Sequence, residues 1–181
     1  ISTLSRKVGG MEAVIDKNNG TIRYKIVVDL IYGNVRSYED IESRIRLVDK
    51  SFSNPYYFLL VTELNQRIFS QLPTEQREFI TYKLIEKIDS YFDDNSLSVN
   101  YPSSCIVTIV NTQKNPIGSR ECSDLIKVIE EELGISCNIA VSDAFTGLLE
   151  VHNVYPEINN AMKYSFIYGY GNVFTEQAVQ A

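Results

Sequence analysis

The spacing of hydrophobic and polar positions predicts two helices in the first part of the chain. Over residues 21–32, apolar side chains recur every four positions, which is typical of a helix with one buried face, and Gly33 follows as a stop signal. A second helix is expected from Ser37 to about residue 50, because Ser37 and Asp40 have the spacing of a capping box. Neither helix carries a polar constellation, so both are interpreted as structural.

An apolar heptad pattern precedes these helices. Five residues fall at this spacing: Ile1, Leu4, Val8, Met11 and Ile15. The pattern predicts a coiled-coil seam through which the chain would form a homodimer or continue into a linker. Gly9 and Gly10 interrupt the seam, and each glycine costs a helix about 1 kcal/mol relative to alanine. A helix packed on its own domain and a frayed tail are therefore equally open interpretations.

From residue 56 onward, strand patterns appear between helices. Residues 56–62 are almost continuously apolar, which predicts a central strand buried on both faces. A long helix is expected from Pro73 to about residue 92. Residues 97–101 and 105–110 then predict a hairpin around the turn that begins at Pro102.

The last third continues this alternation. We expect a helix capped by Ser119 and closed by Gly134, an alternating strand at 135–142, a helical segment at 155–166 and a short strand at 172–175. The core order is the split β-α-β-β-α-β pattern of ferredoxin-like folds. The predicted fold class is therefore α+β, with a mostly antiparallel sheet of about five strands, helices packed on one face and leading helices before it.

Composition narrows the expected partners. Hydrophobic residues make up 44% and charged residues 22% of the chain, as in ordinary globular proteins. The net charge of -6 argues against direct nucleic acid binding, because phosphate contacts need clustered Lys and Arg. No stretch approaches the roughly 20 apolar residues that cross a bilayer, so no membrane contact by this fragment is expected.

Cysteine and histidine usage offers little chemistry. Cys105, Cys122 and Cys137 lie far apart without a C-x-x-C motif, which suits a reducing cytoplasm. The single histidine, His152, has no Cys or carboxylate at ligand spacing, which favours a structural role. The sequence therefore predicts no catalytic residue, no metal and no cofactor.

The C-terminal segment carries a more specific pattern. Its residues are Tyr155, Glu157, Ala161, Tyr164, Phe166 and Gly169, followed by the short strand. With the order of elements and the penultimate strand at 136–142, they resemble a degenerate domain of the GGDEF and nucleotide-cyclase palm class. This domain precedes the DNA-binding module in AraC-family transcription regulators of Gram-positive bacteria. The leading segment at 26–34 is similar to the helix that opens the region in them.

The resemblance implies a bacterial signal-transduction protein, and its chemistry can be tested on the residues. Cyclases of this class hold two metal ions with carboxylates from the end of the first strand and from the hairpin. Here that strand end offers Glu63, with Asn65 where a second acid would stand. The hairpin reads Pro102-Ser-Ser-Cys-Ile106 instead of Gly-Gly-Asp-Glu-Phe. One carboxylate cannot anchor two ions, so Glu63 is at most a remnant ligand and is otherwise a structural carboxylate.

These observations predict a signalling domain that is not an enzyme. It would relay the state of an adjacent sensor or receiver, as in two-component systems, to a DNA-binding domain outside this fragment. It would lie in the cytoplasm, whether or not the parent regulator is membrane-tethered. Two alternatives stay open: a nucleotide- or amino-acid-binding module without turnover, and an active cyclase with an unusual site.

The same pass along the chain predicts a domain map. Residues 1–20 form a helical or linker segment, and 176–181 form a tail. Residues 21–175 form the degenerate GGDEF-like domain, of which 21–50 are the leading helices and 56–175 the palm core.

Overall fold

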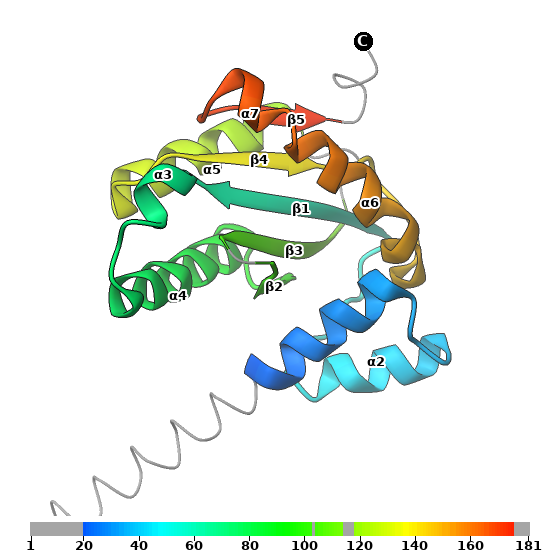
Figure 1. Cartoon of the computed structure of the whole chain (residues 1–181). Coiled ribbons are helices and arrows are strands. Elements are labelled where there is room, and N and C mark those ends of the chain that lie inside the picture. Colours follow the sequence, from blue (N-terminus) through cyan, green and yellow to red (C-terminus); the bar gives the residue numbers. More distant parts are fainter. Residues whose placement is uncertain (1–19, 103, 114–117, 176–181) are drawn as a thin grey trace, which may run out of the picture.

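One five-stranded sheet organises the part of the chain that the computed structural model describes, residues 20–102, 104–113 and 118–175 (Figure 1). The strands are β1 (Tyr56–Leu64), β2 (Ser96–Asn100), β3 (Cys105–Thr112), β4 (Cys137–Val141) and β5 (Val173–Thr175), in the order β2-β3-β1-β4-β5. The central strand β1 pairs antiparallel with β3 and β4, β2 pairs antiparallel with β3, and β5 pairs parallel with β4. The predicted α+β class with a mostly antiparallel sheet is confirmed.

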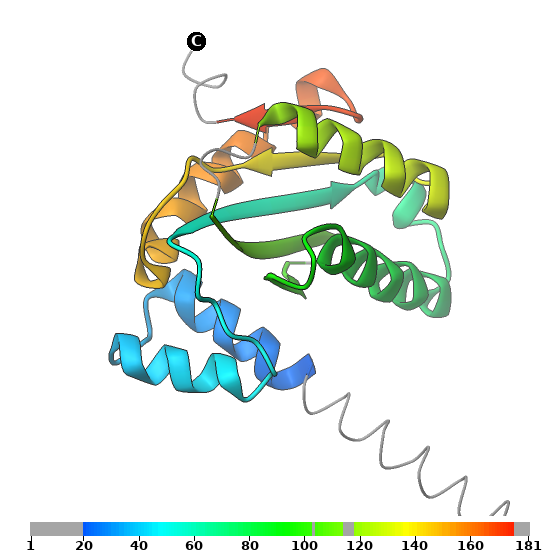
Figure 2. The same cartoon turned by 180° about the vertical axis from the view of Figure 1, so that it is seen from behind.

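Helices cover both faces of this sheet (Figures 1 and 2). A leading helix at 20–32 precedes α2 (Tyr38–Arg46), α3 (Gln66–Phe69), α4 (Thr74–Tyr91), α5 (Ser119–Leu133), the 3-10 turn η1 (Leu148–Glu150), α6 (Val151–Met162) and α7 (Ser165–Tyr168). Helices α4 and α5 pack on one face, and the leading helix, α2 and α6 pack on the other. The expectation of helices on one face is wrong, because three further helices also need an apolar surface to cover.

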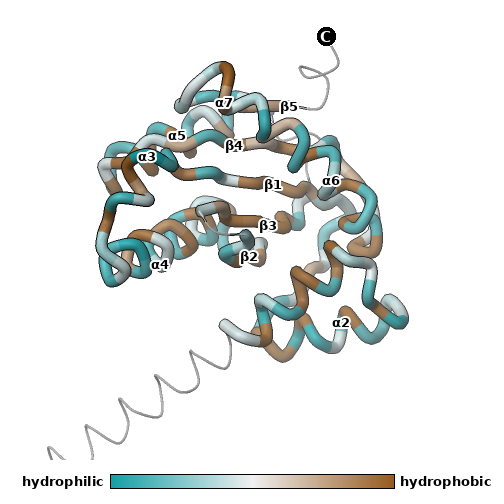
Figure 3. Tube along the Cα trace, in the orientation of Figure 1, coloured by the Kyte–Doolittle hydropathy of each residue, from teal (hydrophilic) through white to brown (hydrophobic). Residues whose placement is uncertain are grey.

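The strand interiors are apolar on both sides, as a sheet between two helical layers requires. Along β1, Phe58 and Leu60 face α4 and α5, whereas Leu59 and Val61 face the other helical layer. All five residues of β4 are buried, so the alternation predicted for this segment does not leave one face exposed. Figure 3 shows apolar residues gathered along β1 and β3, with hydrophilic residues on the surrounding helices.

Several helix ends follow the local signals. The Ser37 hydroxyl accepts a hydrogen bond from the Asp40 N–H at 3.2 Å and caps α2. Gly134 ends α5 with a φ of 67°, a backbone conformation that favours glycine. Ser119 is not the cap of α5 but its first residue, because Gly118 occupies the cap position without a side-chain bond.

The C-terminal helical segment differs from the prediction at both ends. Helix α6 begins at Val151 rather than Tyr155, since Leu148 and Val151 are already buried against the sheet. Pro156 therefore lies inside the helix, where it removes one backbone hydrogen bond near the first turn. The helix ends at Met162, and α7 follows as a separate short helix.

Some predictions concern residues outside the described ranges. The seam at Ile1, Leu4, Val8, Met11 and Ile15 and the tail at 176–181 are among them, so both remain predictions. Among the described helices, none combines the length and hydropathy needed to cross a bilayer.

Candidate functional site

A pocket opens at the edge of the sheet where β1 ends. Its volume is about 550 Å³, and its walls come from β1, the α3 region and the α7 region. The lining residues are Glu63, Asn65, Gln66, Arg67, Ser165, Phe166, Ile167, Gly169 and Tyr170. The pocket therefore joins the carboxyl end of the central strand with the C-terminal segment.

Glu63 is the carboxylate around which the pocket is built. Its Oε1 accepts hydrogen bonds from the Ser165 hydroxyl at 3.1 Å and from the Tyr170 hydroxyl at 3.2 Å. Its Oε2 lies 3.9 Å from the Cys105 thiol. These donors come from two segments that are remote from Glu63 in sequence, the start of β3 and the α7 region, so the tertiary fold places Glu63 as an anchored acceptor at the pocket wall.

Gln66 connects the pocket to the β2–β3 hairpin. Its side-chain amide donates a hydrogen bond to the Ser104 hydroxyl. Its backbone N–H donates to the Tyr170 hydroxyl at 3.1 Å, so Tyr170 accepts from Gln66 while donating to Glu63. One tyrosine thus holds both the strand end and the start of α3.

Two asparagines hold the loops behind the pocket. The Asn65 backbone N–H donates to the Ser136 carbonyl at 2.9 Å. The Asn65 side-chain amide donates to the Ser136 hydroxyl at 3.3 Å. The fully buried Asn138 donates to the Gly169 carbonyl at 2.7 Å and accepts from the Asn172 N–H at 2.8 Å. Buried amides that are fully paired in this way fix a loop in one conformation.

Burial shapes the acid–base behaviour of the groups around Glu63. Burial, followed by the negative charge of Glu63, raises the pKa of the Cys105 thiol to about 12. Burial also raises the pKa of Tyr170, and Glu63 adds to this shift. Both groups are therefore protonated at neutral pH, and Cys105 lacks the thiolate that a nucleophile requires.

The residues of the pocket do not fit a two-metal centre. Glu63 is the only carboxylate among the lining residues, and its Oε1 already accepts bonds from Ser165 and Tyr170. Within the described ranges, no three or more His, Cys, Asp or Glu side chains group so that they could hold a metal ion. His152 lies elsewhere, with its Nδ1 2.9 Å from the Ile31 carbonyl oxygen. We derive no reaction step through a metal.

Sequence reasoning found part of this site. Glu63 does lie beside Cys105 of the hairpin, and Asn65 lines the same pocket as Glu63. Ser165, Gln66 and Tyr170 were missed, because no periodicity or motif marks them. The available signal was the pair of glycines around Tyr170, Gly169 and Gly171, whose φ angles are 75° and 91°. Gly169 ends α7.

Comparisons with known proteins identify the fold. No protein-family profile matches the sequence, and no curated protein sequence matches it. The solved coiled coil and GGDEF domain of DgcB from Caulobacter crescentus in complex with c-di-GMP matches with a TM-score of 0.58 and 10% identity, covering 96% of this chain and 97% of that one. The active GGEEF domain of a diguanylate cyclase from Vibrio cholerae matches with a TM-score of 0.53 and 11% identity, covering 84% and 95%. The chain has the GGDEF fold of diguanylate cyclases.

This GGDEF fold corrects one expectation. The prediction that the chain is not an enzyme is overturned, because the scaffold is that of cyclases that include a domain described as active. The prediction rested on the residues of one strand end and one hairpin, which is too local a criterion for a whole domain. A third match is the diguanylate cyclase SiaD from Pseudomonas aeruginosa, solved with its activator SiaC, with a TM-score of 0.52 and 7% identity over 96% of this chain and 74% of that one.

Proposed function

We propose that this GGDEF-fold domain is a signalling domain of a bacterial AraC-family transcription regulator. It would relay the state of an adjacent sensor or receiver domain to a DNA-binding domain outside these 181 residues. The C-terminal packing pattern and the leading segment at 26–34 support the regulator assignment through their resemblance to that family. The heptad residues before the leading helix would extend the relay as a dimer seam.

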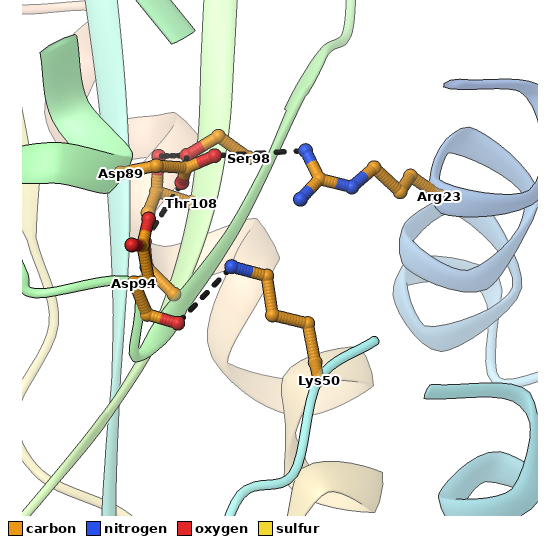
Figure 4. Close-up of polar contacts among 7 residues, drawn as sticks. Arg23, Lys50, Asp89, Asp94, Ser98 and Thr108 are labelled. Carbon is orange, nitrogen blue, oxygen red and sulfur yellow. Dashed lines mark hydrogen bonds and ion pairs between the residues drawn. The ribbon is translucent and has the colours of Figure 1, made fainter. Parts of the chain in front are cut away.

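The attachment of the leading helices to the palm carries this proposal (Figure 4). Arg23 of the leading helix lies 3.6 Å from the Asp89 carboxylate, in the last turn of α4. Lys50, after α2, donates to the Asp94 carbonyl oxygen at 3.0 Å, just beyond α4. Both cations therefore lie near the negative end of the α4 helix dipole. The last turn of α4 has no basic residue of its own. A displacement of the leading helices would therefore change these two contacts at the end of α4.

Asp89 extends this contact into the sheet. Its carboxylate accepts hydrogen bonds from Ser96 at 2.7 Å and Ser98 at 2.8 Å, both on β2. The Ser98 hydroxyl also lies 2.8 Å from that of Thr108 on β3. These groups are buried. In a buried hydrogen-bond network, the loss of one member leaves its partners unpaired and costs stability. The network offers a continuous path from Arg23 to two strands.

The parent gene and the parent protein test this proposal together. The reading frame should encode a helix-turn-helix region after residue 181, and its absence would refute the regulator assignment. In the purified parent protein, Arg23→Met should reduce the signal-dependent change in promoter binding, measured by fluorescence anisotropy. Lys25→Met is the matched control, because Lys25 lies on the same helix and its ion pair among the described residues is with Asp29 of that helix, at 3.3 Å. Equal responses of both variants would contradict a relay through Asp89.

As a second function, we propose that the Glu63 pocket binds a guanine nucleotide or a cyclic dinucleotide. The pocket of about 550 Å³ supports this, since small-molecule sites typically have volumes of roughly 300–1,000 Å³. Two structures of the GGDEF domain of DgcB, which has the same fold, were solved with c-di-GMP, so c-di-GMP is the first ligand to test. Glu63 would accept a hydrogen bond from an N–H group of the guanine base, and Gln66 and Arg67 would lie at the rim of the pocket.

Calorimetric titration tests the pocket. GTP and c-di-GMP are added to the chain, to Glu63→Gln and to the control Glu75→Gln, which lies in the exposed first turn of α4. Glu63→Gln should weaken binding about tenfold or more, because a hydrogen bond to a charged acceptor is worth about 1.5–3 kcal/mol. Absence of binding by the unchanged chain would refute this second function. Chromatography of the same mixtures with added Mg²⁺ detects any conversion of the nucleotides.

A further inference from the structure

An aromatic cluster joins the leading helix to the hairpin beside the pocket. Tyr101 follows directly after β2, and its hydroxyl lies 2.8 Å from that of Tyr32 on the leading helix. Its ring also contacts Tyr24 of that helix, with ring centroids 6.1 Å apart at 65°, and Tyr155 of α6, at 6.2 Å and 50°. Inclined arrangements of this kind are favourable for aromatic pairs. Two elements outside the pocket therefore hold Tyr101 in place.

The other side of the same turn contacts two residues of the pocket wall, Gln66 and Glu63. The Tyr101 N–H donates to the Cys105 carbonyl at 3.0 Å, which fixes the two ends of the turn relative to each other. Ser104 accepts from the Gln66 side chain with its hydroxyl and from the Leu64 N–H at 3.3 Å with its carbonyl. Because the Tyr101 N–H bond links Tyr101 directly to Cys105, a shift of Tyr101 moves Cys105 with it.

We propose that Tyr101 is a positioning residue that transmits the placement of the leading helix to the hairpin and so sets the geometry of the Glu63 pocket. The inference rests on the second function proposed above, in which this pocket takes the ligand. When the leading helix holds Tyr101 through Tyr32, Ser104 and Cys105 stand where they contact Gln66 and Glu63. When the Tyr32–Tyr101 contact breaks, this end of the pocket loosens.

The Tyr32–Tyr101 contact is separable from the anchoring of the helix. The leading helix is also held by the Arg23–Asp89 ion pair and by buried apolar residues such as Ile26 and Leu30. Tyr32 is 57% exposed, so its hydroxyl contributes little to the core. A weak contact at the surface can break while the helix stays docked, which is what a regulatory contact requires.

Amide hydrogen exchange of the full chain, followed by NMR, tests the coupling. Tyr32→Phe keeps the ring and removes only the hydroxyl. Exchange at Tyr101, Cys105 and Leu64 should rise about three- to tenfold, as expected for one lost hydrogen bond. Amides in the middle of β1 should change less than about twofold. The control Tyr82→Phe removes a hydroxyl from an exposed tyrosine on α4 and should change none of these rates.

The alkylation rate of Cys105 gives a second readout. This rate would not change in Tyr32→Phe if Tyr101 had a purely structural role. Cys122 and Cys137 are buried, so a loosened hairpin should speed the reaction of Cys105 alone. Unchanged exchange and alkylation in Tyr32→Phe, or an equal rise throughout the sheet, would overturn the coupling. Titration with GTP and c-di-GMP separates the two proposals. A chain that binds neither nucleotide refutes the ligand, while the exchange rates still decide the coupling.

Discussion

Ser98 donates a hydrogen bond of 2.8 Å to the buried carboxylate of Asp89 and thereby joins the edge strand β2 to the end of α4. The Asp89 carboxylate also accepts a bond from Ser96 and pairs with Arg23. A single side chain therefore connects a helix, a strand and the leading helix. Its buried position makes it the natural point at which to test how the palm is held together.

Replacing Asp89 with alanine should destabilise the domain by about 2–4 kcal/mol. The change leaves the buried Ser96 hydroxyl without its acceptor and removes the partner of Arg23. Urea unfolding followed by circular dichroism measures the difference. The control Asp124→Ala, at an exposed position of α5, should stay within about 0.5 kcal/mol. Equal effects of both variants would show that the Asp89 network does not stabilise the fold.

Gly134 and Gly147 form a matched pair for testing backbone strain. A Cβ atom would meet no other atom within 4 Å at either position, so packing does not distinguish them. Gly134 has a φ of 67°, and Gly134→Ala should cost about 1–2 kcal/mol. Gly147 has a φ of -141°, which any residue can adopt, and Gly147→Ala should be neutral or stabilising by up to about 1 kcal/mol. Thermal unfolding ranks the two, and the reverse order would contradict the backbone argument.

The tyrosines predict a loss of stability at alkaline pH. Burial raises the pKa of Tyr57 to about 12, and the hydrogen bond between Tyr101 and Tyr32 is the main cause that raises the pKa of Tyr101 to about 12. Since the unfolded value is about 10, their contribution is complete below pH 10 and is lost as the pH rises toward 12. Unfolding in urea at pH 9 and pH 11.5 should show this fall. In Tyr32→Phe, absorbance at 295 nm should report a lower pKa for Tyr101.

The thiols should resist alkylation in the folded protein. Burial is the main cause that raises the pKa of Cys105, Cys122 and Cys137 to about 12, so little thiolate exists at pH 8. Iodoacetamide should modify Cys105 in the folded protein, though slowly, because Cys105 is only partly buried. Cys122 and Cys137 are buried and should react only after unfolding in urea. Peptide mass mapping gives the order. Rapid modification of Cys137 in the folded chain would contradict the burial of β4.

The local elements were largely predictable because their signals are local. The apolar run at 56–62 is the centre of β1, and the long helix expected from Pro73 is α4. Gly33 and Gly134 end their helices with positive φ values. The start of α6 was misplaced, because burial of Leu148 and Val151 against the sheet outweighs the turn preference of Pro156.

The sequence by itself determined the order of strands and helices and the position of Glu63 at the end of the central strand, because hydrophobic period and glycine placement act over a few residues. Only the tertiary structure decided what surrounds that carboxylate. Ser165 and Tyr170 lie 102 and 107 positions away along the chain and reach Glu63 through sheet pairing and helix packing. Such long-range contacts leave no periodic trace in the sequence. The leading helix likewise meets Tyr101 and Asp89 only in the folded domain.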